Sequence, residues 1–555
     1  MAPQDDDLAF KERIRRVSDR SSKDHSYPRP DLINLSSYLA EPPLHKSRLS
    51  STDLAPTGSD HGIMESFACV YDIIHGDRSS FAASPRGLQE FSEHEPSAES
   101  SLIFLRGFAS PQWLNVLGEI YDPNSELYRR HLAFQLLTSG DRDYFASPSL
   151  PSASARVFQL TIPTICTRNV GTSGYEPEDL QLARARQSDA MAKYFQSLRD
   201  NGKVADSVVR KCAIISKEEY ILEQAVTVEV GPPAENWRAI IWLDNGRDLS
   251  QSVPGPWNPM PGMKSWETYF FPVIVHQATG FSSIVAHEAT DQDEVMPKII
   301  STNTSKTLPK DKEKWSAAQN ICLLPFQYGS HLRKELASRD ALYALSELFY
   351  FAASAEVQVL NLLDKRIAHE LSFVGAEKVA TWNSICLLNL KYIKSLLTSQ
   401  NRRLATTVDI LRNRHSLDWP QAENDSTVEK TANLLLSDFE HLLLRAEMLA
   451  RECEQGMITL ANSSVLEESR RSADTGIRVQ RLTIIGTVFI PLSFVCSIWG
   501  TNFKEFGSGS KPVWMLFAST GPVILLSYLI YNWDAFKRLY RKKSCKKGKS
   551  RYPES

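Results

Sequence analysis

The sequence predicts an α/β domain, followed by long helices and a two-helix transmembrane hairpin. Short runs rich in β-branched and aromatic residues lie between about 155 and 280, as expected for strands. Beyond 330, apolar residues recur at helical spacing. Near the end of the chain, two uncharged apolar runs cover 482–500 and 513–533, and each is close to the length needed to cross a bilayer.

Composition narrows the class of protein. The 555 residues exceed one compact domain, and 42% apolar content is enough for a core. A net charge of −2 gives no sign of a nucleic-acid-binding protein. The eight scattered cysteines include no CxxC pair, which favours a reducing compartment and offers no zinc site. The start of the chain has no apolar stretch of the kind that marks a cleaved signal peptide.

We expect five regions along the chain. They are a Ser-, Pro- and charge-rich disordered region, an α/β domain with loop insertions, long helices that include a stalk, the transmembrane hairpin and a basic cytoplasmic tail. Their bounds are 1–60, 61–328, 329–480, 481–533 and 534–555.

The α/β region begins with "SLIFLRGFASPQWLNVLGEIYDPNSELYRRHL". We expect a strand, a turn at Gly107, and a helix with Trp113, Leu114 and Leu117 on one face. Further strands are predicted at "ARVFQLTI", "AVTVEV", "RAIIWL" and "TYFFPVIV". The Pro/Gly-rich "SVPGPWNPMPGM" is predicted to be a loop, and the polar residues 285–316 are predicted to be a loose insertion.

Three helices are predicted after residue 330. Apolar positions at helical spacing mark the first, residues 376–413 the second, and the third begins near Thr427 after the break "HSLDWPQAENDST". The third carries a heptad seam, either for packing against partner chains or for a hairpin core inside one subunit. Continued to Gly500, it would be about 110 Å long. The apolar positions of the first helix are Leu342, Leu345, Phe349, Leu360, Leu363 and Ile367, and the seam consists of Leu435, Leu442, Leu449 and Gly456 with Phe439, Ala446, Cys453 and Leu460.

The two apolar runs could be buried core helices, but the basic residues around them favour a membrane hairpin. Nine basic residues and no acidic one lie between 537 and 551, and four arginines (Arg470, Arg471, Arg478 and Arg481) precede the first run. The positive-inside rule then places both termini in the cytoplasm and "TNFKEFGSGSKP" outside. We expect a multi-pass protein, in the plasma membrane rather than in an organelle.

A single hairpin encloses no path, so it either anchors the chain or assembles into a pore. On the first span, the residues Leu482, Gly486, Ile490, Ser493 and Ser497 fall on one face, which predicts a pore-lining stripe. Small residues also mark ordinary helix–helix contacts in membranes. Pro491 is expected to bend the helix.

An amide follows the first span. Neither span holds Asp, Glu, Lys, Arg or His, and Mg²⁺ releases its water reluctantly, so neutral oxygens would hold a still-hydrated cation. Asn502 is the candidate group, contacting the ion through ion-bound water; the alternative is a helix cap, since Gly-x-Asn is a common helix ending.

These residues carry a resemblance. "LTIIGTVFIPLSFVCSIWGTNF" resembles the first transmembrane helix of CorA-type magnesium transporters, through Phe489, Pro491 and Leu492 and the closing Gly-x-Asn-Phe. The short loop, second helix and basic end follow in the same order, and the long polar N-terminus is similar to that of divergent CorA-like proteins of fungi. The resemblance implies a CorA-like homopentamer with a cytoplasmic α/β funnel and passive entry of Mg²⁺, sometimes of Co²⁺, Ni²⁺ or Zn²⁺.

Carried over by position, the resemblance makes Asn502 a selectivity ring and Gly500 the turn before it. It makes Ser493 a polar ring, and Ile490 and Leu482 hydrophobic constrictions. The chain departs from the family triplet Gly-Met-Asn, because Thr501 replaces the methionine. The outer loop also departs from the often acidic loop of the family, because Lys504, Glu505 and Lys511 give it a net charge of +1.

The resemblance also implies that Mg²⁺ is a regulator as well as the transported ion, with no permanently bound cofactor. The regulatory sites cannot be placed; the acidic "DQDE" at Asp291–Glu294 reads as a solvated run.

Three functional classes compete. A divalent-cation transporter, mainly for Mg²⁺, is favoured by Asn502, Pro491 and the uncharged spans. A scaffold or signalling protein with a degenerate, non-conducting pore is favoured by Thr501 and the cationic loop. An enzyme is not expected, since no HExxH, GxSxG, P-loop or GxGxxG fingerprint is present.

Overall fold

The computed structural model describes most of the chain, and the contacts divide it into two units. Unit 1 holds residues 1–373 and 385–457, and unit 2 holds 374–384 and 458–555. The residues described are 9–19, 31–40, 65–97, 99–136, 155–170, 180–234, 236–257, 266–275, 319–372, 380–422, 425–500, 503–504 and 510–531. The predicted insertion 285–316 and the basic tail lie outside these residues.

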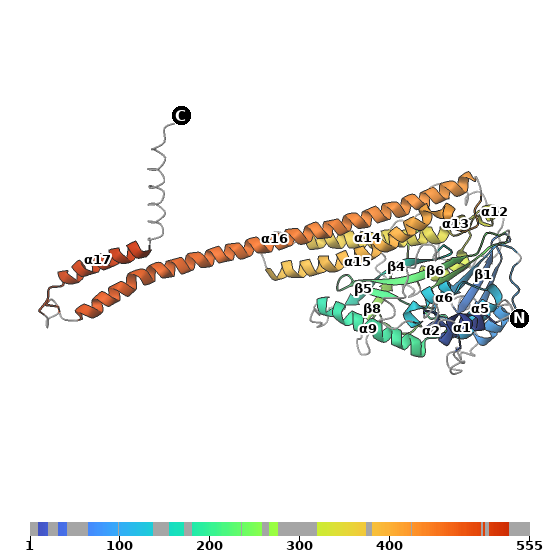
Figure 1. Cartoon of the computed structure of the whole chain (residues 1–555), viewed down its shortest axis with the longest axis horizontal. Coiled ribbons are helices and arrows are strands. Elements are labelled where there is room, and N and C mark those ends of the chain that lie inside the picture. Colours follow the sequence, from blue (N-terminus) through green and yellow to red (C-terminus); the bar gives the residue numbers. More distant parts are fainter. Residues whose placement is uncertain are drawn as a thin grey trace, which may run out of the picture. The chain divides into compact units, whose positions relative to one another are not determined.

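Unit 1 is built on one eight-stranded sheet in the order β2-β1-β3-β7-β6-β4-β8, with β5 paired to β6 (Figure 1). Its pairs are antiparallel except for β3 and β7. All the predicted strands are present, and the expectation of a mixed α/β region is confirmed. The strands are β1 (Ser66–Asp72), β2 (Arg78–Ala82), β3 (Ser101–Arg106), β4 (Val157–Val170), β5 (Lys211–Ile214), β6 (Glu219–Val230), β7 (Arg238–Leu243) and β8 (Trp266–Phe270).

The parallel pair β3–β7 forms the centre of the sheet. Its register runs from Ser101 opposite Arg238 to Arg106 opposite Leu243, and every β3 residue is buried. The nearly continuous apolar runs fit strands covered on both faces. Gly107 follows β3 at φ +68°, and a Cβ there would lie 2.4 Å from the Asp206 carbonyl oxygen. The predicted strand, turn and helix are therefore confirmed.

Helices cover both faces of the sheet (Figure 1). One face carries the N-terminal helices and the helices near β3, which share one apolar core with it. The other carries α14 and α15 and the first part of α16. The helices are α1 (Phe10–Asp19), α2 (Asp31–Ala40), α4 (Pro85–Ser92), α5 (Pro111–Tyr121), α6 (Ser125–His131), α7 (Ala133–Leu136), α9 (Leu180–Asn201), α11 (Leu324–Gln327), α12 (Lys334–Ala337), α13 (Ala341–Ala344), α14 (Ser346–Ser372), α15 (Ala380–Arg412), α16 (Ser426–Trp499) and α17 (Trp514–Tyr531), with short 3-10 helices at Asn320–Leu323 and Arg414–Ser416.

The N-terminal region differs from the expectation of disorder over 1–60. Helices α1 and α2 pack into the core of unit 1, and both helices carry buried apolar side chains. The Phe10 ring meets Tyr128 edge-on, with 5.4 Å between ring centroids, and Arg13 pairs with Asp122. The Tyr38 hydroxyl donates to the Ala109 carbonyl at 2.7 Å. The polar composition conceals these few apolar positions, which are enough to dock two short helices.

The heptad seam of α16 is buried within the chain. Phe439 meets Phe349 of α14 edge-on at 6.1 Å, and Phe349 stacks on Phe158 of β4 at 5.6 Å. A Cβ at Gly456 would lie 2.5 Å from the Leu371 side chain, so the helices approach closely there. Of the two alternatives left open by the sequence, the structure supports the intrachain hairpin core for this seam.

Unit 2 contains the apolar end of the chain. Helix α16 has 74 residues and runs on from unit 1 into unit 2, ending at Trp499; α17 follows after a short connection. In that connection Phe503 bridges to Lys511, and the Lys504 amide donates to the Lys511 carbonyl at 2.9 Å. Within the described residues, α16 is long and apolar enough to cross a membrane, and α17 adds a shorter apolar helix.

Docking of α1 depends on the absence of a side chain at Gly118. A Cβ at this position would lie 2.4 Å from the Phe10 ring, so Gly118→Ala must displace Phe10. Overpacking of this kind costs about 1–3 kcal/mol. We expect amide hydrogen exchange in residues 10–19 to become about 5- to 100-fold faster while the sheet stays protected.

The matched control is Glu119→Ala, at the exposed neighbouring position of α5. It is expected to leave exchange in α1 unchanged. Unaltered protection of α1 in Gly118→Ala would contradict the docking described here.

Candidate functional site: an uncharged stripe along α16

The predicted pore-lining residues all lie on one continuous helix. Leu482 and Ile490 are 70% and 71% exposed, Ser493 and Ser497 are exposed, and Gly486 is half-buried. Because successive residues turn by about 100°, the helix brings the five to one face. That face is largely uncovered within one chain.

The hydroxyl groups on this part of α16 donate to their own helix. Thr483 and Thr487 donate to the carbonyls of Val479 and Thr483, each at 2.8 Å. Ser493 donates to the Ile490 carbonyl at 2.9 Å. Their protons are therefore satisfied without a partner helix, while the hydroxyl oxygens keep lone pairs that can accept further hydrogen bonds.

The predicted stripe is longer than the sequence analysis found. Continued towards the N-terminus in alternating steps of three and four residues, it reaches back to Ile458 and forms what we call the uncharged stripe. Leu482 borders it. The stripe consists of Ile458, Asn462, Val465, Ser469, Ser472, Gly476, Val479, Thr483, Gly486, Ile490, Ser493 and Ser497.

Charge distribution distinguishes this stripe from the rest of the helix. Between 466 and 481 the helix carries charged residues at seven positions, and none is on the stripe. They are Glu467, Glu468, Arg470, Arg471, Asp474, Arg478 and Arg481. The part of the stripe before residue 482 was not predicted, because the prediction considered the apolar run alone. The signal for it is the heptad spacing of uncharged residues from Ile458 onwards.

The predicted pore mouth is described only in part. Gly500 ends the helix in the left-handed region, at φ +56°, and its amide donates to the Cys496 carbonyl at 3.0 Å. A Cβ there would meet nothing within 4 Å, so the demand for glycine is conformational rather than steric. Thr501 and Asn502 lie outside the described residues, and their roles remain predictions.

Pro491 lies inside α16, which continues past it to Trp499. Its missing amide leaves the Thr487 carbonyl without its usual helical donor. The predicted bend remains a prediction. Asp291–Glu294 is also outside the described residues, and among those described no group of three or more His, Cys, Asp or Glu side chains is placed to hold a metal ion.

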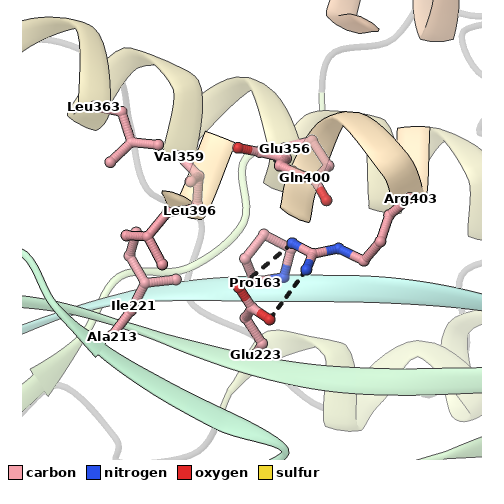
Figure 2. Close-up of a pocket in the computed structure, with 10 residues that line it drawn as sticks. All are labelled: Pro163, Ala213, Ile221, Glu223, Glu356, Val359, Leu363, Leu396, Gln400 and Arg403. Atoms are coloured by element: carbon pink, nitrogen blue, oxygen red, sulfur yellow. Dashed lines mark hydrogen bonds and ion pairs between the residues drawn. The ribbon is translucent and has the colours of Figure 1, made fainter. Parts of the chain in front are cut away.

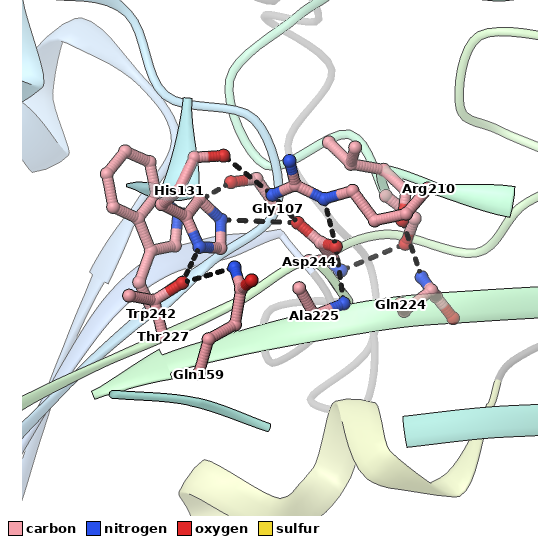
Figure 3. Close-up of polar contacts among 12 residues, drawn as sticks. Gly107, His131, Gln159, Arg210, Gln224, Ala225, Thr227, Trp242 and Asp244 are labelled. Atoms are coloured by element: carbon pink, nitrogen blue, oxygen red, sulfur yellow. Dashed lines mark hydrogen bonds and ion pairs between the residues drawn. The ribbon is translucent and has the colours of Figure 1, made fainter. Parts of the chain in front are cut away.

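The α/β domain contains a buried polar cluster around Asp244 (Figure 3). Arg210 makes two hydrogen bonds of 2.7 Å to the Asp244 carboxylate, and His131 Nε2 lies 3.2 Å from it. The His131 ring stacks on Trp242, with 4.0 Å between centroids. Burial lowers the pKa of His131 to about 4 despite the nearby carboxylate. The cluster joins α6 to β6 and β7; His131 and Asp244 are buried, and the Arg210 side chain is 19% exposed.

A second cluster lies between the sheet and helices α14 and α15 (Figure 2). Glu356 of α14 is 3% exposed, accepts a hydrogen bond from Gln400 and faces a cavity of about 10 Å³, room for about one water. Arg403 pairs with Glu223 of β6 at 3.2 Å. Burial raises the pKa of Glu356 to about 7, although Arg403 and Gln400 act in the opposite direction.

The comparison with known families matches the C-terminal part of the chain. Residues 387–538, which are 152 of the 555, match the sequence model of the family described as CorA-like Mg²⁺ transporter protein. No curated protein matches the chain. The matched stretch holds most of α15 and all of α16 and α17, including the residues that carry the resemblance to CorA-type transporters.

The match indicates the general class of protein. It makes residues 387–538 similar to a family of transporters, which are not enzymes, as predicted. Together with the two apolar helices, it identifies a membrane protein. The description of that family names Mg²⁺ as the transported ion.

The raised pKa of Glu356 predicts a pH-dependent stability. The folded carboxyl stays neutral up to about pH 7, whereas the unfolded one ionises above its ordinary pKa of 4.5, so stability falls as pH rises through this window. Glu356→Gln keeps the neutral form and the hydrogen bond from Gln400. We expect it to stabilise the fold by about 1–3 kcal/mol at pH 8 and to change nothing at pH 4.5, in thermal unfolding of the full chain.

Glu119→Gln, at an exposed position of α5, serves as the control and is expected to follow the wild-type profile. If Glu356→Gln gave the same change in melting temperature at both pH values, the proposed ionisation of Glu356 would be excluded.

Proposed function

We propose that this protein passes divalent cations, mainly Mg²⁺, through a pore formed by several parallel copies of α16, in a homopentamer. The uncharged stripe carries the proposal. It runs through a charge-rich stretch and into the apolar stretch of the helix, and it is mostly exposed in one chain. Copies of the same stripe around a central axis would cover one another and leave the charged residues outside.

The chemistry of the stripe suits a hydrated ion. In a parallel assembly each stripe position becomes a ring, so Ser493 and Ser497 would contribute neutral hydroxyl oxygens. Mg²⁺ keeps its water tightly, and neutral oxygens can accept hydrogen bonds from that water without trapping the ion. Ile490 and the bordering Leu482 would form apolar constrictions between these rings.

Asn502 is the proposed selectivity group at the mouth of the pore. Several amide carbonyls around an axis would accept hydrogen bonds from the water of one ion. Gly500 supports this placement, because its left-handed conformation ends the helix just before the amide. Thr501 would take the place held by methionine in the family triplet.

The basic residues flanking the two apolar helices support a cytoplasmic position for both termini. Arg478 and Arg481 precede the apolar part of α16, and the polybasic run follows α17. Cations would then enter from the loop side, driven by the membrane potential. We place the protein in the plasma membrane, with Mg²⁺ acting as both the transported ion and a regulator.

The second candidate function is a scaffold or signalling protein with a closed pore. Lys504 and Lys511 favour it, because with Glu505 they give each loop a net charge of +1. A unit-charge pair at ~10 Å in water is worth about 0.4 kcal/mol, and several copies around a divalent ion add to a few kcal/mol of repulsion.

Asn502→Ala tests the conducting pore. In proteoliposomes with an inside-negative potential and a Mg²⁺-sensitive dye, the wild-type protein is expected to admit Mg²⁺. The variant should lose the flux at least about tenfold, because its mouth offers no acceptor to the water of the ion. Thr501→Met restores the family triplet and is expected to retain or increase the flux.

Two outcomes would redirect the proposal. If Asn502→Ala kept the wild-type Mg²⁺ flux, the proposed selectivity role of the Asn502 amides would be excluded. No flux from correctly inserted wild-type protein, with rescue by Thr501→Met, would favour the scaffold function.

Cross-linking tests the assembly. With Cys496 and Cys545 replaced by Ser, Ser472→Cys on the stripe is expected to give dimers with a short thiol-reactive cross-linker. Asp474→Cys, two residues away and about 200° around the helix, is the control and should stay monomeric on a denaturing gel. Equal cross-linking of both, or a monomeric mass in lipid, would contradict the central position of the stripe.

A further inference from the structure

The buried face of α1 ends in a serine. Phe10, Ile14 and Ser18 are spaced four residues apart and are 3%, 8% and 8% exposed. The first two belong to the apolar core of unit 1. Ser18 lies in the last turn of the helix and continues the same face, so a change of charge at this position acts directly on the docking of α1.

Two arginines precede this serine at fixed distances. Arg15 and Arg16 stand three and two residues before Ser18, in the sequence Arg-Arg-Val-Ser. Protein kinases that prefer basic substrates bind arginines at these two positions through acidic pockets, by charge-assisted hydrogen bonds. The Arg15 side chain is 63% exposed, and its carboxylate contacts, Glu12 at 3.8 Å and Asp19 at 3.7 Å, are on the same short helix.

We propose that Ser18 is a phosphorylation site for a basic-directed protein kinase, and that phosphate there releases α1 from the α/β domain. The kinase transfers the γ-phosphoryl group of ATP. The bond between that phosphorus and the ADP oxygen breaks, a bond from Ser18 Oγ to phosphorus forms, and the hydroxyl proton passes to the base of the kinase. ADP leaves.

The docked position cannot hold the product. Phosphoserine carries a charge of about −1.5 to −2 and three acceptor oxygens, which would have to enter a buried face. The last turn of a helix also presents the negative end of its dipole, and Asp19 adds a carboxylate beside it. The released helix exposes the phosphate to water and allows Arg15 to approach it.

Access to the kinase depends on the same equilibrium. A kinase needs the acceptor hydroxyl free and the flanking residues in its groove, whereas docked α1 is helical and its hydroxyl face is covered. Phosphorylation of Ser18 therefore reports the undocked fraction of α1. Once the phosphate is in place, it prevents redocking, and the modification holds the N-terminal segment in the released state.

The experiment treats the full-length protein with Mg-ATP and the catalytic subunit of cAMP-dependent protein kinase, and follows phosphate at Ser18 by peptide mass spectrometry. We expect slow modification of the wild type. Gly118→Ala, which displaces Phe10 without altering α1, should accelerate it about 5- to 100-fold. Arg15→Ala in the Gly118→Ala background should slow it at least about tenfold. No phosphate at Ser18 in Gly118→Ala would overturn the assignment of the site.

Hydrogen exchange tests the consequence of the modification separately. Phosphorylation of Ser18 is expected to make amide hydrogen exchange in α1 at least about tenfold faster, and Ser18→Glu is expected to cause a smaller increase. Ser37→Glu, at an exposed position of α2, is the control and should keep the wild-type protection. Full protection of α1 with phosphate on Ser18 would overturn the release.

Discussion

Helix α16 has to satisfy two different surroundings on opposite faces, and the rest of the assignment depends on this constraint. Leu460, the last residue of the heptad seam, is 1% exposed, whereas Ile458 is 56% exposed. The two positions differ by about 200° around the helix axis. The same chain covers the seam face as far as Leu460, and Ile458 on the opposite face begins the uncharged stripe. Beyond Leu460 most side chains on all faces of α16 are exposed, and the stripe is distinguished from its surroundings by its lack of charge.

Much of the architecture could be predicted because its signals are local. The run "SLIFLRGFASPQWLNVLG" contains the strand, the left-handed Gly107 and the helix face that the structure shows. The break before α16 and the length of this helix could also be predicted from the sequence. The order of strands was not, because pairing β3 with β7 across more than a hundred residues depends on contacts that no short segment encodes.

The N-terminal helices and the full stripe escaped prediction for related reasons. In α1 three inward positions among ten residues, most of them polar or charged, decide docking, and Gly118, which receives Phe10, lies about a hundred residues away. In α16 the predicted pore-lining face was confined to the apolar run that begins at Leu482, whereas the uncharged stripe begins 24 residues earlier, at Ile458. In both cases the relevant pattern lies in the spacing of a few residues and not in the overall composition of the segment. The roles of Thr501 and Asn502 stay predictions.

The hydrogen bonds that Thr483, Thr487 and Ser493 make to their own helix have a consequence for which ions could follow the proposed path. Each hydroxyl proton is already committed to a carbonyl one turn earlier. At these three positions the wall offers lone pairs but no free donors, so a chloride ion would find nothing there to replace its lost water, whereas the water of a cation would find acceptors. Discrimination against anions would then need no charged side chain in the lining.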